Sequence, residues 1–138
     1  MQRRTFTGAQ GQTLAAEAVG EGPPVLLAHG GGQTRAAWSK VSRTLAKAGY
    51  QAIAIDMRGH GESEWSPSGA YHFSDFAADL IAIADTLQGK PAVVGASLGG
   101  LAGLLAEGEL RPGIFSSLTL VDVAPQLEPE GVAHILGF

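Results

Sequence analysis

The sequence contains no cysteine among its 138 residues. Disulfides and thiolate metal sites are therefore excluded, and redox chemistry gives no information about the compartment. No apolar run approaches the roughly 20 residues of a membrane-spanning helix, and the first residues lack the apolar segment of a signal peptide. We therefore expect a cytoplasmic protein without a membrane partner.

Basic residues are few and do not cluster. Lysine and arginine number 9 against 13 acidic residues, which gives a net charge of −4. Because nucleic-acid binding needs a basic patch or stripe, we expect no nucleic-acid partner. The acidic residues and histidines lack the spacing of metal ligands, so we expect neither a metal nor another cofactor.

Glycine, in contrast, is abundant at 20 residues, and it separates segments whose hydrophobic patterns alternate between strand and helix. Two short strands, 4–8 and 13–20, are predicted to form a hairpin. The following alternation βαβαβαβ predicts an α/β fold, a mostly parallel sheet with helices on both faces. Its strands are predicted at 25–28, 52–55, 92–95 and 118–123, with helices at about 34–48, 76–87 and 98–107. Ser74 or Asp75 could cap the second of these helices.

The segment Gly95-Ala96-Ser97-Leu98-Gly99 lies where a predicted strand meets a predicted helix. In that context the pattern indicates a nucleophile elbow, a sharp turn that holds a serine hydroxyl at the end of a sheet. Ser97 is the candidate nucleophile, and the N–H of Leu98 at the helix start could donate to an oxyanion. The alternative is a plain glycine- and serine-rich turn between strand and helix.

A glycine run, His29-Gly30-Gly31-Gly32, follows the end of an earlier predicted strand. Its flexible backbone could aim a second N–H at the same developing charge. Gly31 is the first choice for this donor, and Gly32 is the second. The rival interpretation is a phosphate cradle, but the run lacks both the Gly-x-Gly-x-x-Gly spacing and a Gly-Lys-Ser/Thr ending.

These segments together resemble the α/β-hydrolase superfamily, most closely its cofactor-free esterases, lactonases, perhydrolases and epoxide hydrolases. The similarity rests on residues 29–34, 56–63 (Asp-Met-Arg-Gly-His-Gly-Glu-Ser), 95–100 and 120–125, which occur in the family's order. The resemblance implies that Ser97 attacks an ester or related acyl substrate, with Leu98 and Gly31 as oxyanion donors. It also implies that residues 56–63 form a structural turn beside the pocket.

In this family an acid and then a histidine follow the nucleophile along the chain. Asp122 is a candidate acid because some members place theirs at the end of this strand, although capping of the following turn is the favoured interpretation. His134 is the only histidine after Ser97. His29 and His60 are expected to organise their loops, and His72 is expected to be exposed.

The resemblance covers the N-terminal half of such a fold only. We expect residues 1–124 to form the N-terminal part of the core and residues 125–138 to begin a truncated cap, so that the last strands and the base histidine are missing. The chain alone would then be a weak or inactive hydrolase, or a catalytically incompetent homologue. The uncovered strand 117–123 would favour a homodimer formed edge to edge. Another chain could also supply the missing half.

Overall fold

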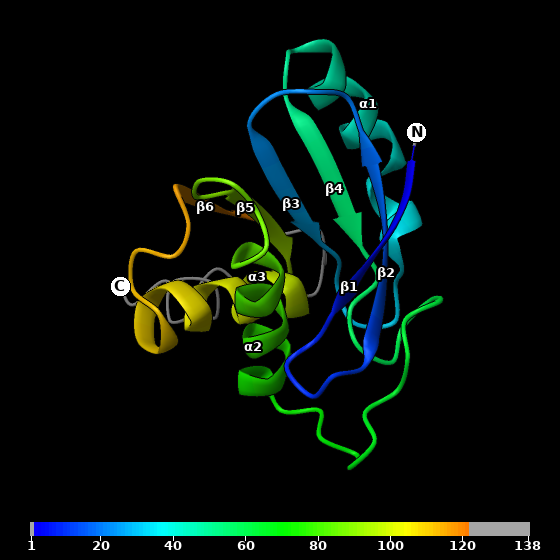
Figure 1. Cartoon of the computed structure of the whole chain (residues 1–138), viewed down its shortest axis with the longest axis vertical. Coiled ribbons are helices and arrows are strands. Elements are labelled where there is room, and N and C mark those ends of the chain that lie inside the picture. Colours follow the sequence, from blue (N-terminus) through cyan, green and yellow to red (C-terminus); the bar gives the residue numbers. More distant parts are fainter. Residues whose placement is uncertain (1, 122–138) are drawn as a thin grey trace.

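Six strands form one mixed sheet in the computed structural model, which describes residues 2–121 (Figure 1). Their order across the sheet is β1-β2-β4-β3-β5-β6. The predicted α/β fold with a mostly parallel sheet is confirmed. The strands are β1 (Gln2–Thr7), β2 (Thr13–Val19), β3 (Pro24–Ala28), β4 (Gln51–Ile55), β5 (Ala92–Ala96) and β6 (Ser117–Val121). The helices are α1 (Ser39–Lys47), α2 (Phe73–Ala84) and α3 (Leu98–Leu105), with a 3-10 turn η1 (Arg35–Trp38) before α1 and a π-helical turn η2 (Ala106–Leu110) after α3.

The predicted hairpin is present as β1 and β2, and β2 pairs antiparallel with β4. The remaining pairs, β3 with β4, β3 with β5 and β5 with β6, are parallel. The chain first moves from β3 to β4 in one direction and then crosses back over β3 to β5. Parallel crossover connections are right-handed in nearly all known cases, so this reversal places the connecting helices on opposite faces of the sheet.

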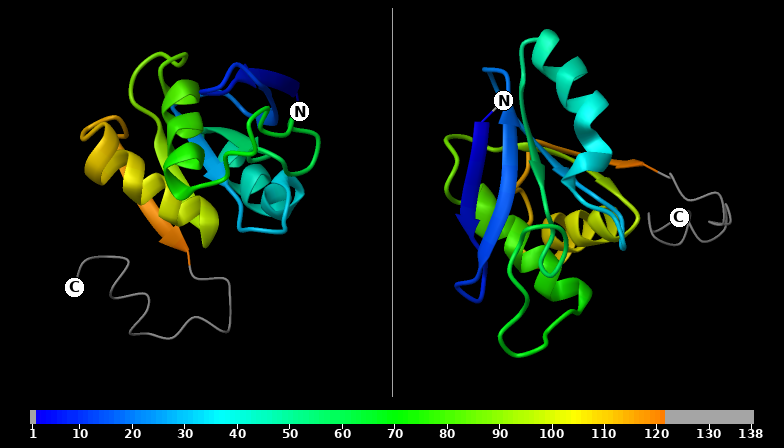
Figure 2. Two further views of the ribbon diagram at one scale, coloured as in Figure 1. Left: turned by 90° about the horizontal axis from the view of Figure 1, so that it is seen from below. Right: turned by 90° about the vertical axis from the view of Figure 1, so that its right-hand side faces the viewer.

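Helices α2 and α3 lie on one face of the sheet and α1 lies on the other (Figures 1 and 2). Side chains of the central strands alternate between two apolar layers. Leu26 and Ile53 join the cluster beneath α2 and α3, whereas Leu27 and Ala54 pack with Trp38 on the α1 side. Successive strand residues point to opposite faces, so a strand covered on both sides is a continuous apolar run. This explains why β3 and β4 could be recognised from the sequence.

The helix ends differ in detail from the sequence expectations. The predicted helix 34–48 starts as the 3-10 turn η1, where Thr34 Oγ1 accepts the Ala36 N–H at 3.3 Å. Helix α2 begins at Phe73, before the expected caps Ser74 and Asp75. The Asp75 carboxylate instead acts from inside the first turn, where it accepts the His72 N–H at 2.9 Å. A carboxylate there also complements the positive end of the helix dipole.

Strand β6 is the last in the strand order, and among the described strands it pairs only with β5. Its Leu118 and Leu120 side chains approach α3 at Gly103 and Gly100. Asp122, His134 and the expected cap segment 125–138 lie outside the described residues, so the expectations for them stay predictions. Within residues 2–121 no helix has the length and apolarity to cross a membrane, and no group of three or more acidic or histidine side chains is arranged to hold a metal.

Candidate active site

The two predicted oxyanion segments meet because their strands are neighbours. In the parallel pair β3 and β5, Ala28 is opposite Gly95, so the residues after each strand end emerge side by side. The Gly99 N–H donates to the His29 carbonyl at 3.1 Å and ties the elbow to the glycine run. The site therefore lies at the carboxyl ends of the strands, next to the point where the strand order reverses, where α/β sheets bind ligands.

The elbow is strained at Ser97. This residue has φ 51° and ψ −114°, and it is the one non-glycine residue with positive φ within residues 2–121. Neighbouring glycines let the turn close: a Cβ on Gly95 would lie 2.6 Å from the Gly99 carbonyl oxygen, and one on Gly99 would lie 2.7 Å from Ala28 Cβ. Strain of this kind persists where the surroundings over-determine the backbone, and it is concentrated at functional sites. Ser97 is exposed, and Leu98 opens α3 directly after it.

The glycine run forms a tight turn beside Ser97. The Gln33 N–H donates to the Gly30 carbonyl at 3.1 Å, and Gly32 has φ 77° while Gly31 does not have positive φ. These are the features of a type II turn with Gly31 and Gly32 at its centre. A Cβ on Gly30 would lie 3.4 Å from Ser97 Cβ, whereas one on Gly31 would meet nothing within 4 Å.

His29 holds the start of this turn, in the organising role expected from the sequence. Its fully buried ring donates from Nδ1 to the Gly30 carbonyl at 2.7 Å and accepts the Met57 N–H at Nε2, 2.9 Å away. Burial lowers the pKa of His29, and this outweighs the opposite effect of the bond to Gly30. The ring is thus neutral, and both nitrogens are occupied, so His29 is not available as a base for Ser97.

The other described histidines lie outside the elbow's hydrogen bonds. His60 Nδ1 donates to the Arg58 carbonyl at 2.9 Å, and its ring centroid lies 5.0 Å from that of His29. His72 is exposed just before α2. Within residues 2–121, no histidine is hydrogen-bonded to Ser97.

The comparisons with known proteins agree with this geometry. A sequence model of the alpha/beta hydrolase fold family matches residues 23–134. The chain belongs to the α/β-hydrolase fold family. An esterase of Mycobacterium tuberculosis is 36% identical over 107 residues, which are 77% of this chain and 35% of that protein. An epoxide hydrolase of Caballeronia sordidicola is 40% identical over 77 residues, or 54% of this chain and 23% of that protein.

Solved structures of the α/β-hydrolase fold extend the likeness to the whole arrangement. An epoxide hydrolase from Vigna radiata superposes with a TM-score of 0.82 and 27% sequence identity. The match covers 98% of this chain and 46% of that one. The chain thus spans less than half the length of these relatives, and it corresponds to the part of the fold that holds the elbow and the glycine turn.

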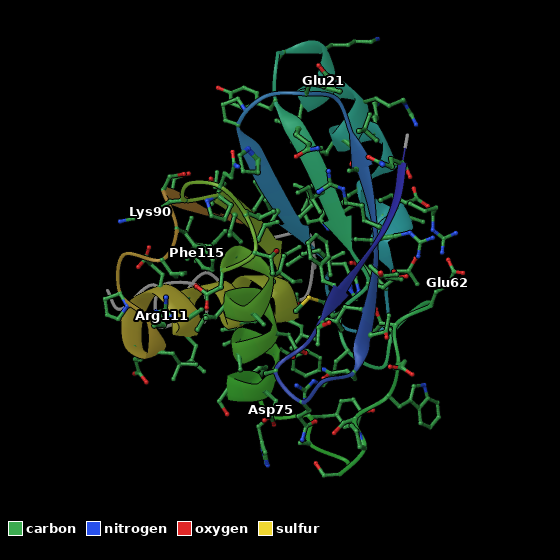
Figure 3. All side chains as sticks on the ribbon, viewed as in Figure 1. Glu21, Glu62, Asp75, Lys90, Arg111 and Phe115 are labelled. Carbon is green, nitrogen blue, oxygen red and sulfur yellow. The ribbon has the colours of Figure 1, made fainter. Side chains whose placement is uncertain are left out.

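Sequence reasoning placed Asp56 in a structural turn of this α/β-hydrolase core but missed the charged pair by which it supports the glycine turn. Asp56, fully buried after β4, accepts the Arg35 backbone N–H at 2.7 Å and is paired with the Arg35 guanidinium. It also accepts the Glu62 N–H at 3.0 Å, so one carboxylate joins the end of the glycine segment to the loop after β4. Although burial acts in the opposite direction, hydrogen bonds to Glu62 and Glu17 raise the pKa of Arg35. Figure 3 places Glu62 on the side of β1 and β2, away from Lys90 and Arg111.

A second buried pair fixes the same loop to α2. Arg58 Nε and Nη2 donate to the two carboxylate oxygens of Asp79, each at 2.8 Å, and both side chains are at most 3% exposed. Asp79 also accepts the Ala9 N–H at 2.9 Å, which ties in the β1–β2 hairpin. Asp79 stands between Phe76 and Leu80 on the apolar face of α2, and a charge on such a face was the available signal for a buried partner.

Proposed function

We propose that the chain carries the nucleophile and oxyanion part of a serine hydrolase that acts on an ester or related acyl substrate. The observation that carries this proposal is the strained, exposed Ser97 beside the glycine turn. The esterase among the relatives supports an acyl substrate, and a small molecule is the expected partner. Cytoplasmic location stays a prediction from the sequence.

In the proposed reaction, Ser97 Oγ attacks the acyl carbon, and negative charge develops on the carbonyl oxygen. The N–H of Leu98, at the first residue of α3, and the N–H of Gly31, at the centre of the turn, would donate to this oxygen. Such preorganised donors act where charge forms, and the positive end of a helix adds to them. The turn packs against the elbow, since a Cβ on Gly30 would lie 3.4 Å from Ser97 Cβ, and this proximity supports the assignment.

A general base must take the proton of Ser97. Among the described histidines, His29 has both ring nitrogens engaged, and no hydrogen bond joins His60 or His72 to the elbow. We therefore propose that residues 2–121 do not contain the base and that the chain alone reacts slowly. Asp122 as the acid and His134 as a histidine after the nucleophile stay predictions.

Intact-mass spectrometry after treatment with a fluorophosphonate tests the proposal. We expect one covalent adduct to form slowly on the folded chain and none on Ser97→Ala, because the elbow and the oxyanion donors retain part of the reactivity when the base is missing. Circular dichroism of both proteins shows whether they are folded. A folded wild-type chain that takes no label, even after long incubation, contradicts activation of Ser97.

The turn offers a clean test of the Gly31 donor. Proline is favoured at the first central position of a type II turn, so Gly31→Pro should remove the N–H while keeping the turn. Gly31→Ala is the matched control, because it retains the N–H and its methyl group meets nothing within 4 Å. Loss of one oxyanion donor should slow labelling by about 100-fold to 1000-fold. Equal labelling rates for the two variants would remove Gly31 from the mechanism.

A second candidate function is self-association of a catalytically incompetent homologue through β6. The supporting observation is that β6 stands last among the described strands of the sheet, with the Thr119 side chain exposed and Leu118 and Leu120 only partly buried. A strand with a neighbour on one side only is a template for pairing with a second copy. A twofold dimer would extend the sheet across the subunits.

Light scattering coupled to gel filtration tests this association. We expect the mass of a dimer, and we expect Thr119→Lys to give a monomer because charged side chains on an edge oppose pairing. Gln88→Lys, on an exposed loop after α2, adds the same charge elsewhere and should stay dimeric. A monomeric wild-type chain would contradict the dimer while leaving the hydrolase proposal intact.

A further inference from the structure

The Gln33 residue bonds back to the first residue of the glycine turn. The backbone N–H of Gln33 donates to the Gly30 carbonyl at 3.1 Å, and the Gln33 side-chain oxygen Oε1 accepts the Gly30 N–H at 3.0 Å. Both polar backbone groups of Gly30 are therefore engaged by the same residue. Since the partner of Oε1 is an N–H, the orientation of the carboxamide is fixed by chemistry: only its oxygen can accept that bond.

This bond decides which N–H groups remain for a ligand. Within residues 2–121, the N–H groups of Gly30 and Gln33 have partners in the turn, whereas none is recorded for Gly31 or Gly32. The carboxamide also lies close to the elbow. The position that a Cβ of Gly30 would take is 3.0 Å from Gln33 Oε1 and 3.4 Å from Ser97 Cβ.

The turn needs such a restraint because it is built of three consecutive glycines. Glycine loses more conformational freedom on folding than any other residue, so an unrestrained run samples many backbone states. The His29 ring donates a hydrogen bond to the Gly30 carbonyl, and the Asp56 carboxylate accepts the Arg35 N–H two residues after the turn. Within the turn, residues 30–33, the Gln33 side chain bonds back to the backbone of Gly30.

We propose that Gln33 is a positioning residue of the oxyanion turn: its side-chain oxygen occupies the Gly30 N–H, so that Gly31 presents the free donor at Ser97. This inference rests on the proposed hydrolase function. Gln33 itself takes no part in bond making. Its role is to hold the backbone of the turn in the conformation that aims the Gly31 N–H.

Two measurements on wild type, Gln33→Ala and Gln33→Glu test it. The first is NMR of the Gly30 amide, which does not depend on the reactivity of Ser97. Loss of the acceptor in Gln33→Ala should speed hydrogen exchange at Gly30 by about tenfold, the equivalent of one net hydrogen bond, and move its proton signal upfield. Gln33→Glu keeps an acceptor with a full charge, so the Gly30 proton should stay protected and move downfield. Gln88→Ala, another exposed glutamine, should change neither.

The second measurement is the rate of fluorophosphonate labelling. Gln33→Ala should label about tenfold more slowly than wild type, in proportion to the lost restraint. Gln33→Glu should restore the restraint and yet label slowly, because its carboxylate opposes the developing oxyanion. Added salt should relieve that effect, since it screens exposed charges, and it should leave the Gln33→Ala rate unchanged.

The outcomes separate the two proposals. An unchanged Gly30 amide in Gln33→Ala overturns the inference, because the bond would then not exist in solution. A changed amide with a wild-type labelling rate also overturns it, because the bond would not position the donor. A wild-type chain that takes no label contradicts the hydrolase proposal, and the role of Gln33 in the reaction falls with it, whatever the exchange rates show.

Discussion

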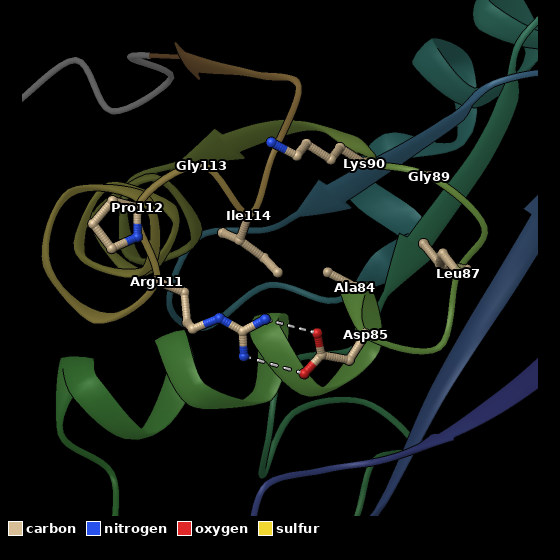
Figure 4. Close-up of a pocket in the computed structure, with 9 residues that line it drawn as sticks. All are labelled: Ala84, Asp85, Leu87, Gly89, Lys90, Arg111, Pro112, Gly113 and Ile114. Carbon is tan, nitrogen blue, oxygen red and sulfur yellow. Dashed lines mark hydrogen bonds and ion pairs between the residues drawn. The ribbon is translucent and has the colours of Figure 1, made fainter.

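Two arginine–aspartate pairs attach α2 to loops at opposite ends of the sheet, and their surroundings differ completely. At the carboxyl end, Arg58 and Asp79 are 0% and 3% exposed. At the amino end, Arg111 and Asp85 are 52% and 50% exposed, with nitrogen–oxygen distances of 3.1 and 3.4 Å (Figure 4). The exposed pair borders a hollow of about 280 Å³ that is open to solvent.

The difference indicates that the ion pair near the candidate site holds more of the fold together than the exposed pair does. Asp79 accepts bonds from the hairpin as well as from Arg58, so the buried pair joins three segments behind the candidate site. The exposed pair joins two elements only. A buried charge without its partner is strongly unfavourable, whereas water replaces a lost partner at the surface. We therefore expect the carboxyl end to be sensitive to substitution and the amino end to be tolerant.

The largest effect is expected for Asp79→Ala. Removing this carboxylate leaves the buried Arg58 guanidinium uncompensated, and breaking such a pair costs about 3–5 kcal/mol of the free energy of unfolding. Urea denaturation followed by circular dichroism measures the loss. The double variant Asp79→Leu with Arg58→Met should recover part of it, because an apolar pair leaves no unpaired charge. A loss below 1 kcal/mol in the single variant would contradict the burial of this pair.

The second effect concerns the elbow backbone. In Gly99→Ala, the new methyl group would collide with the Ala28 carbonyl oxygen and lie 2.7 Å from Ala28 Cβ. Overpacking of this kind costs about 1–3 kcal/mol. The control is Gly108→Ala in η2, where an added Cβ meets nothing within 4 Å. Thermal unfolding should show a lower Tm for the first variant and an equal or higher Tm for the second; similar values would argue against the close approach of β3 and α3.

A third test uses pH and His29. Burial lowers the pKa of His29 in the folded chain below its ordinary value of 6.5, so the unfolded chain binds the proton more readily. The stability that this neutral ring contributes is complete above pH 6.5. It is lost as the pH falls through the folded pKa, by at most about 1.4 kcal/mol per pH unit.

Urea midpoints at about pH 7.5 and pH 5.5 measure this slope. Wild type should lose more stability over this interval than His29→Gln, because glutamine at position 29 does not titrate. If the two proteins lose the same amount, the pH dependence comes from other groups, and the buried neutral state of His29 is not its cause.

Much of this fold could be read from the sequence because the deciding signals are local. Buried strands such as β3 are continuous apolar runs, and the glycines around Ser97 mark a turn that needs close backbone approach. The supports of the site are not local: Asp56 meets Arg35 across 21 residues, and Asp79 meets Arg58 across the same separation. Only the topology brings these partners together. The capping position of Asp75 was also misplaced, because a helix start depends on the first turn's hydrogen bonds rather than on residue type alone.

The smallest effect is expected for the exposed pair of Arg111 and Asp85. Asp85→Ala removes the partner of Arg111, yet both side chains are half exposed, and surface ion pairs contribute about 0–1 kcal/mol. We expect the urea midpoint to change little, and the small change to shrink further in high salt, which screens exposed charges. Arg111→Ala should behave alike, because its loss leaves Asp85 in water. A loss as large as that of Asp79→Ala would mean that the amino end is held as tightly as the site, and the contrast between the two ends of α2 would no longer hold.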